Sequence, residues 1–223
     1  MPENISCNID IYRLLTKKSA AKVEVFNHIK TVMSLWKEVL EELAGELSTN
    51  VCGENEDIVI EYLDVSTFEA KLRASGDILF SYVHTNVFAL DESHYLHQHS
   101  YLKKNELEGY FGTLNLYYFL GDSIKYNRLN DNGILIARVM VNKSGLFFVE
   151  GIRAFGEFDR FDHKRPLTRE RMKVLAEMAL KHMLDIDLTL PPRQHAQLLS
   201  VGDIQSLRQE LRFNTTQRLG FRK

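Results

Sequence analysis

The sequence predicts an α+β fold, in which a long N-terminal helix precedes an antiparallel meander sheet of five to seven strands and two C-terminal helices follow. Two observations predict it. One apolar stripe with helical spacing spans residues 19–48, and β-rich runs separated by turn-forming residues fill residues 57–155. Helices and strands do not alternate along the chain, which argues against a parallel α/β sheet.

The long helix is expected to begin at Ser19, a residue type that often caps helices. Its apolar residues recur every three or four positions: Val25, Phe26, Ile29, Val32, Met33, Trp36, Val39, Leu40, Leu43 and Leu47. This stripe is broader than a coiled-coil seam, so we expect the helix to cover a sheet. Residues 1–18 are expected to form a loosely ordered lead-in, pinned to the body by Ile9, Ile11, Leu14 and Leu15.

The first strands are expected at residues 58–63, 68–74 and 78–90. In the second, apolar residues alternate with Glu69, Lys71 and Arg73, which is typical of a half-buried strand. Gly76 and the residue after it favour a tight hairpin, because glycine tolerates a positive φ. The third run is apolar on both faces and is therefore expected near the centre of the sheet.

Residues 111–155 supply the rest of the sheet, and Gly145 is expected to close a hairpin in the left-handed conformation. Strand alternation predicts that one face carries Leu114, Leu116, Tyr118, Leu120, Leu135, Ala137, Val139 and Val141. The opposite face then carries a second apolar set: Tyr117, Phe119, Tyr126, Ile134, Ile136 and Met140. Both faces therefore need cover.

The C-terminal part predicts a helix near residues 168–184, capped by Thr168, and a short edge strand at residues 184–190. A last helix is expected to open at residues 200–203, with a frayed tail after it. We therefore expect one α+β domain over residues 1–190 and a C-terminal helical extension over residues 191–223.

The 223 residues are 44% hydrophobic and 26% charged, which is ordinary for a globular protein with a sizeable core. The two cysteines, Cys7 and Cys52, are too few for a disulfide framework, so a reducing compartment is favoured. No signal peptide and no membrane span is evident in the sequence. These features predict a cytoplasmic protein without membrane partners.

The most suggestive chemical motif is the histidine-rich run that contains His94, His97 and His99. Imidazole nitrogens at short spacing are the ligands of zinc and other transition metals. No regular helix or strand would gather all three, so a loop would have to do it. The sequence lacks the His-Glu-x-x-His pattern, and surface histidines of a polar loop are the alternative interpretation.

A second candidate is Glu69 with Lys71 after an acidic residue, Asp57 or Asp64, an arrangement used by metal-dependent nucleases. The wet side of an antiparallel strand explains the same residues. A third candidate is the charge distribution, because residues 1–151 carry a net charge of −7 and residues 152–223 one of +5. The basic third could track phosphates, although a sequence pI of about 6.5 is far from basic.

We expect a non-enzymatic binding or assembly module that self-associates through a sheet face or through the long helix. The two apolar sheet faces and the unlike charges of the two chain ends motivate this expectation. The alternatives are a metal-dependent hydrolase or nuclease that uses the histidine loop, and a nucleic-acid-binding protein that uses the basic C-terminal third. No phosphate-binding glycine loop and no nucleophile elbow is present in the sequence.

Overall fold

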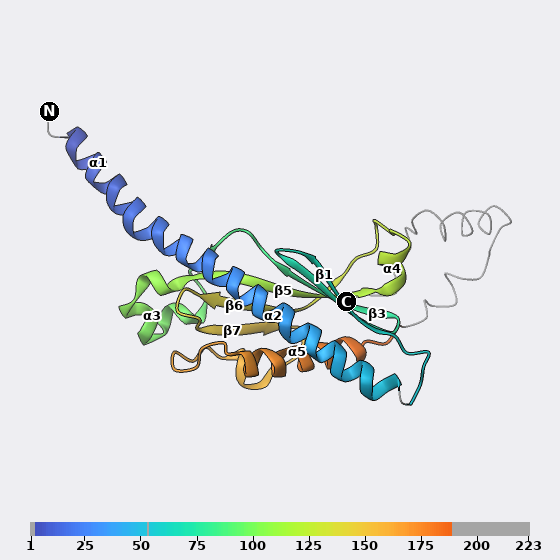
Figure 1. The fold of residues 1–223 in the computed structure, drawn as a ribbon. Coiled ribbons are helices and arrows are strands. Elements are labelled where there is room, and N and C mark those ends of the chain that lie inside the picture. Colours follow the sequence, from blue (N-terminus) through green and yellow to red (C-terminus); the bar gives the residue numbers. More distant parts are fainter. Residues whose placement is uncertain (1–2, 53, 189–223) are drawn as a thin grey trace, which may run out of the picture.

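The computed structural model describes residues 3–52 and 54–188, and it has the expected α+β architecture. A long helical rod lies against an antiparallel sheet (Figure 1). The rod consists of α1 (Glu3–Arg13), a π-helical segment η1 (Leu14–Ser19) and α2 (Ala20–Cys52). Among the described residues, none of the helices combines the length and the hydropathy that a membrane-spanning segment requires.

The sheet has seven strands, and six of them pair in the order β1-β2-β3-β5-β6-β7, all antiparallel. The strands are β1 (Ile60–Ser66), β2 (Glu69–Ala74), β3 (Asp77–Val83), β5 (Tyr110–Leu120), β6 (Ile134–Asn142) and β7 (Phe147–Gly151). The short β4 (Phe88–Ala89) pairs with the beginning of β5. The predicted antiparallel meander is thus confirmed. The strand expected at residues 78–90 is shorter than predicted, because β3 ends at Val83 and residues 88–89 belong to the separate β4.

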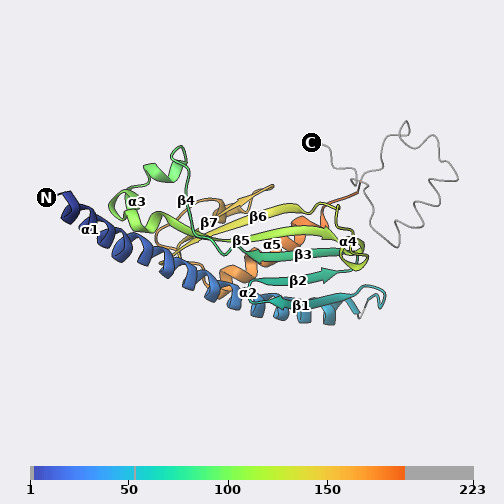
Figure 2. The ribbon, with the colours of Figure 1, turned by 90° about the horizontal axis from the view of Figure 1, so that it is seen from above.

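The main core lies between the sheet and two helices, α2 and α5 (Arg169–Leu184), which run along the same face (Figures 1 and 2). Trp36 is fully buried there and donates its indole N–H to the Ser81 hydroxyl of β3 at 2.9 Å. Thr168 accepts a hydrogen bond from the backbone N–H of Arg171, which confirms it as the cap of α5.

Short helices complete the body. They are η2 (Tyr95–Gln98), α3 (Ser100–Lys104), η3 (Glu106–Gly109), α4 (Gly121–Lys125) and η4 (Gly156–Asp159). The segment between β4 and β5 covers part of the second sheet face. There Leu96 and Leu102 pack with Phe111, Phe148 and Phe161 in a second, smaller core. This cover is local and lies at one end of the sheet.

The expected start of the long helix at Ser19 is wrong. Ser19 lies inside the rod, and the helix continues toward the N-terminus as far as Glu3. The lead-in is therefore helical, and its apolar residues do not pin it to the body, because Ile9, Ile11, Leu14 and Leu15 are all about half exposed or more. A serine caps a helix only where the chain before it leaves the helical conformation, and here it does not.

The predicted face assignment fails at one point of β6. A bulge between Leu116 and Tyr117 shifts the register, so that Tyr118 pairs with Ile134 and Tyr117 with Leu135. An extra residue in one strand reverses which side chains face the core. Ile134 therefore packs against the main core, while Ile136 is fully buried in it. Strand alternation alone predicts the opposite face for both residues, and this prediction is wrong.

Two turns contrast with each other. Gly145 has a φ of +73° in the β6–β7 hairpin, which confirms the left-handed position expected there. In the β2–β3 hairpin, however, the positive φ of +56° belongs to Ser75 and not to the glycine after it.

The described residues include only part of the region for which the sequence predicts C-terminal elements. Residues 185–188 form no strand, and Asp185 instead ends α5, so the predicted edge strand is wrong in the described residues. The last predicted helix and the extension over residues 191–223 lie outside the described residues.

Candidate functional site

The N-terminal part of the rod projects beyond the sheet. In both ribbon views α1 extends past the end of the sheet, away from the main core (Figures 1 and 2). The main contacts of α1 are with η1, its own continuation. A short helix without tertiary packing is marginally stable in water, so this projection is a feature that calls for a functional explanation.

One face of the projection is an apolar stripe whose side chains are largely exposed. Ile11, Tyr12 and Leu15 follow helical spacing, and Ile9 lies at the edge. The side chains of Ile9, Tyr12 and Leu15 are 61%, 70% and 60% exposed. Four large apolar side chains on one helix are therefore open to solvent, which is the signature of an interaction surface.

The opposite face of the projection is polar and borders a groove. Each residue of this face lies two positions after a residue of the stripe, and two positions on an α-helix correspond to a rotation of about 200°. The residues of this face are Asp10, Arg13, Leu14 and Lys17. Two faces of opposite character thus share one helix.

The π-helical segment η1 lies where these faces meet the body. Its six residues, Leu14–Ser19, widen the helix, and the Thr16 hydroxyl donates to the carbonyl oxygen of Tyr12 at 2.8 Å. Such segments occur frequently at functional sites, because each one re-aims the side chains that follow. Lys17 and Lys18 belong to this segment and line the groove.

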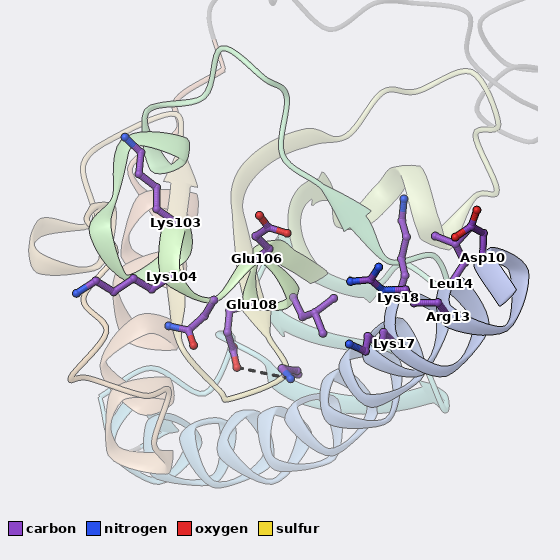
Figure 3. A pocket seen from close by; sticks show the side chains of 12 residues that line it. Asp10, Arg13, Leu14, Lys17, Lys18, Lys103, Lys104, Glu106 and Glu108 are labelled. Carbon is purple, nitrogen blue, oxygen red and sulfur yellow. Dashed lines mark ion pairs between the residues drawn. The ribbon is translucent and has the colours of Figure 1, made fainter. Parts of the chain in front are cut away.

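The groove has a volume of about 800 Å³ and separates the rod from the α3–η3 segment (Figure 3). We call it the rod groove. Its lining residues are Asp10, Arg13, Leu14, Lys17, Lys18, Lys103, Lys104, Asn105, Glu106, Leu107, Glu108 and Lys143. Lys103 and Lys104 extend outward from its far wall, whereas Glu106 lies toward its centre. The groove is therefore rich in charges of both signs.

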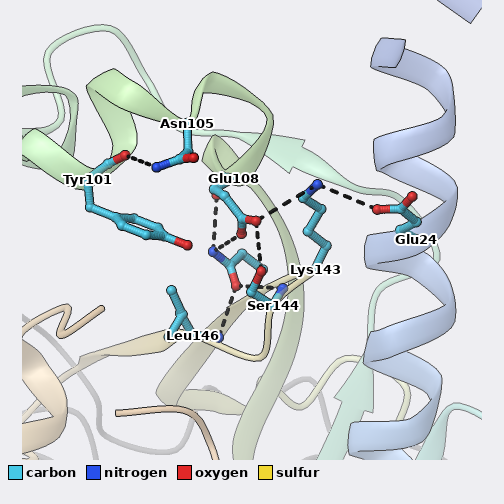
Figure 4. Close-up of polar contacts among 8 residues, drawn as sticks. Glu24, Tyr101, Asn105, Glu108, Lys143, Ser144 and Leu146 are labelled. Atoms are coloured by element: carbon cyan, nitrogen blue, oxygen red, sulfur yellow. Dashed lines mark hydrogen bonds and ion pairs between the residues drawn. The ribbon is translucent and has the colours of Figure 1, made fainter. Parts of the chain in front are cut away.

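The floor of the rod groove is a buried polar network around Glu108 (Figure 4). The Glu108 carboxylate accepts hydrogen bonds from the Asn142 amide at 2.8 Å and from the Ser144 hydroxyl at 2.7 Å. Lys143 lies 3.8 Å from Glu108 and 3.6 Å from Glu24 of α2. Because the carboxylate is almost wholly buried and fully bonded, this network ties the hairpin to η3 and to the rod.

The three histidines of the candidate metal site have separate partners. His94 and His99 each accept a backbone N–H through Nδ1, from Leu96 and Tyr101, and so begin η2 and α3. His97 Nε2 lies 3.3 Å from the Leu90 carbonyl oxygen. Two of the three histidines are thus local helix caps, and His97 has a separate backbone contact.

The described part of the chain contains no group of three His, Cys, Asp or Glu side chains placed to hold a metal ion. His94 lies 3.6 Å from Glu150, and the ring of His99 lies 5.7 Å from that of His163. Metal binding by His94, His97 and His99 therefore stays a prediction, and it has no preformed ligand cluster behind it.

The nuclease-like residues are divided between the two sheet faces. Asp64 pairs with Lys37 of α2 on the helix side. Glu69 and Lys71 alternate with the buried core residues of β2 and so lie on the other side, where Lys71 lies over the ring of Phe80. The two sets do not converge.

Several described cations of the basic C-terminal third are paired within the chain. Arg169 and Lys173 bind Glu42, and Lys173 also binds Glu46 of α2. Arg165 binds Glu157. These pairs fasten α5 to α2 and leave fewer free charges for phosphates than the sequence alone suggests. Nucleic-acid binding stays a prediction.

Comparison with protein-family models, with curated proteins and with solved structures found no match to this chain. The surfaces described above are therefore the guide to a function. The sequence shows the apolar residues of the stripe, but their place before Ser19 predicts a lead-in that packs against the body. The signal that could have corrected this is the i, i+3, i+4, i+7 spacing of Asn8, Ile11, Tyr12 and Leu15, which extends a helix beyond the expected cap.

Proposed function

We propose that this protein is a non-enzymatic assembly module that self-associates through the apolar stripe of its projecting helix. The observation that carries the proposal is the exposure of Ile9, Ile11, Tyr12 and Leu15 on a helix that has no cover of its own. Burial of such side chains is the dominant favourable term in protein association. The occupant we propose is the same stripe of a second copy.

The surroundings of the stripe favour a copy over an unrelated partner. Asn8 extends the stripe and Thr16 borders it, so two identical stripes meet without opposing like charges. Asp10 and Lys17 lie on the opposite, groove-facing side of the helix and so stay outside the contact between the two stripes. The proposed pair is antiparallel, so that each stripe contacts the same stripe of the other copy.

The open face of the sheet is the weaker candidate for self-association. Its central aromatic residues, Tyr117 and Phe119, are half-buried, and Phe80 packs against Phe119. These side chains already have partners inside the chain. Association through the sheet face would therefore bury less apolar area per residue than association through the projecting helix.

Light scattering on the full chain during size-exclusion chromatography tests the proposal. We expect the wild-type mass to rise from that of the 25.9 kDa monomer toward twice this value as the concentration increases through the micromolar range. The double variant Ile11→Asp/Leu15→Asp should remain monomeric. Val174→Asp is the matched control, because Val174 is an exposed aliphatic residue on α5, far from the stripe.

Two results would overturn the proposal. One is a wild-type chain that stays monomeric at all concentrations up to about 200 µM, since association weaker than that has no structural role at ordinary protein levels. The other is a double variant that associates as strongly as Val174→Asp. Circular dichroism of both variants verifies that the body is folded.

A further inference from the structure

A second hollow lies at the opposite end of the sheet from α3, where the β2–β3 turn meets α4. It has a volume of about 470 Å³. Its lining includes Arg73, Ile78, Leu120, Ile124, Lys125 and Arg128. We call it the Arg128 pocket. Its size falls in the range of small-molecule sites, and its walls combine cations with aliphatic side chains.

Arg128 is the central feature of this pocket. Its side chain is only 11% exposed, and its Nε has no hydrogen-bond partner among the described residues. Its Nη1 lies 4.0 Å from Asp131, whose carboxylate also accepts a short hydrogen bond from the Ser123 hydroxyl. Nε itself is closed off from solvent, so the ligand-facing part of Arg128 is the rest of its guanidinium, which belongs to the pocket lining.

The charges around the pocket have one dominant sign. Arg73, Lys125 and Arg128 line it, against the single carboxylate of Asp122. Arg73 donates through Nε to the Ser75 carbonyl oxygen at 2.8 Å, which fixes the direction of its side chain. Lys125 lies 5.2 Å from the ring of Tyr126 and makes no ion pair with a described acid. The pocket is therefore electropositive.

The other wall is apolar. Ile78 and Leu120 face the hollow from the ends of β3 and β5, and Ile124 from α4. A ligand that fits must carry both an anionic group for the cations and an apolar part for these side chains. A free inorganic ion would leave the apolar wall uncovered.

We infer that the Arg128 pocket binds a small organic anion, in which a carboxylate or phosphate group is held by Arg128 and an apolar or aromatic body rests on Ile78, Leu120 and Ile124. The planar guanidinium offers parallel N–H donors that match both oxyanions. Arg73 and Lys125 add long-range attraction. This binding is independent of self-association, because the pocket and the apolar stripe lie on different elements.

Calorimetric titration with phenyl phosphate and benzoate tests the inference, with benzyl alcohol as the neutral control. We expect saturable binding of at least one anion at millimolar or lower concentration, and at least tenfold weaker binding of the alcohol. Arg128→Met should weaken binding of the anion tenfold or more. Lys71→Gln, which removes a cation from the sheet face outside the pocket, should leave the affinity unchanged.

Phenyl phosphate and benzoate test a phosphate and a carboxylate group separately, and binding of either anion supports the inference. If Arg128→Met fails to fold, the exposed double variant Arg73→Gln/Lys125→Gln tests the inference instead. We expect it to bind the anion at least threefold more weakly, and its affinity to depend less on salt than that of the wild type. The inference is overturned if neither anion binds the wild type. It is also overturned if the pocket variants bind as tightly as Lys71→Gln.

Discussion

Trp36 of α2 and Ser81 of β3 are joined by a buried hydrogen bond of 2.9 Å across the main core. Both side chains are fully inaccessible, so the serine hydroxyl is the partner that makes a central tryptophan acceptable in this core. The same bond fixes the position of the long helix over the sheet.

Replacing Ser81 by alanine should lower the free energy of unfolding by about 1–3 kcal/mol, because the indole N–H then has no partner. Urea unfolding of the wild type, Ser81→Ala, Trp36→Phe and the double variant measures the coupling. We expect the two losses to be less than additive by about 1 kcal/mol. Fully additive losses would show that the hydrogen bond contributes nothing.

Gly112 allows the helix to approach the sheet closely. A Cβ atom on this residue would lie 2.8 Å from Cβ of Ile29, which is shorter than any normal contact. Gly112→Ala should therefore destabilise the protein by about 1–3 kcal/mol through overpacking. Adding Ile29→Val should not relieve the clash, since it keeps the Cβ atom, whereas Ile29→Gly should. A neutral Gly112→Ala would contradict the packing described here.

Ser75 adopts a positive φ of +56° in a hairpin turn that glycine would occupy without strain. Ser75→Gly should raise the free energy of unfolding by up to about 1 kcal/mol. Asn127, with a φ of +50°, is the matched comparison, because asparagine tolerates this conformation better and Asn127→Gly should gain less. Thermal unfolding of both variants measures the two gains in stability. A larger gain for Asn127→Gly than for Ser75→Gly would contradict the prediction.

Stability should fall as the pH is lowered through the histidine range. Burial lowers the pKa of His28 and of His182 below the ordinary value of 6.5. The unfolded chain therefore binds more protons near this pH, and the stabilisation present above about pH 6.5 is lost on acidification. Burial raises the pKa of Asp77, whose opposite effect belongs to a lower window that begins near 3.8.

Urea unfolding between about pH 7.5 and about pH 5.5 measures the histidine contribution separately from that of Asp77. The double variant His28→Gln/His182→Gln should show a flatter dependence than the wild type. An equally steep decline in the double variant would assign the effect to other groups.

The main features of the fold follow from residue patterns that act locally. The stripe through Trp36 and the cap at Thr168 predict α2 and α5 because helix periodicity and capping depend only on nearby residues. The position of Gly145 follows in the same way. What could not be predicted depends on distant contacts. The bulge opposite Leu116 exchanges the sheet faces on which Ile134 and Leu135 lie, and nothing in the local sequence marks this bulge.

The candidate surfaces were harder to predict than the fold. Ile11 and Leu15 have the composition of core residues, and only the position of the rod beyond the sheet leaves them exposed. Arg128 gave no local signal, because its low exposure and its place in the pocket lining arise only in the folded structure. Conversely, the conspicuous spacing of His94, His97 and His99 reflects local caps and contacts.

A distance between two copies tests the proposed antiparallel pairing most directly. Thr16 borders the stripe, so a spin label on Thr16→Cys, in a Cys7→Ser/Cys52→Ser background, reports on the neighbouring copy. Helices about 8–10 Å apart that cross near Tyr12 predict an intermolecular label distance of roughly 20–30 Å, and Ile11→Asp/Leu15→Asp should abolish it. If the chain associates but Thr16 labels give no distance in this range, or if the distance survives that double variant, the projecting helix is not the interface.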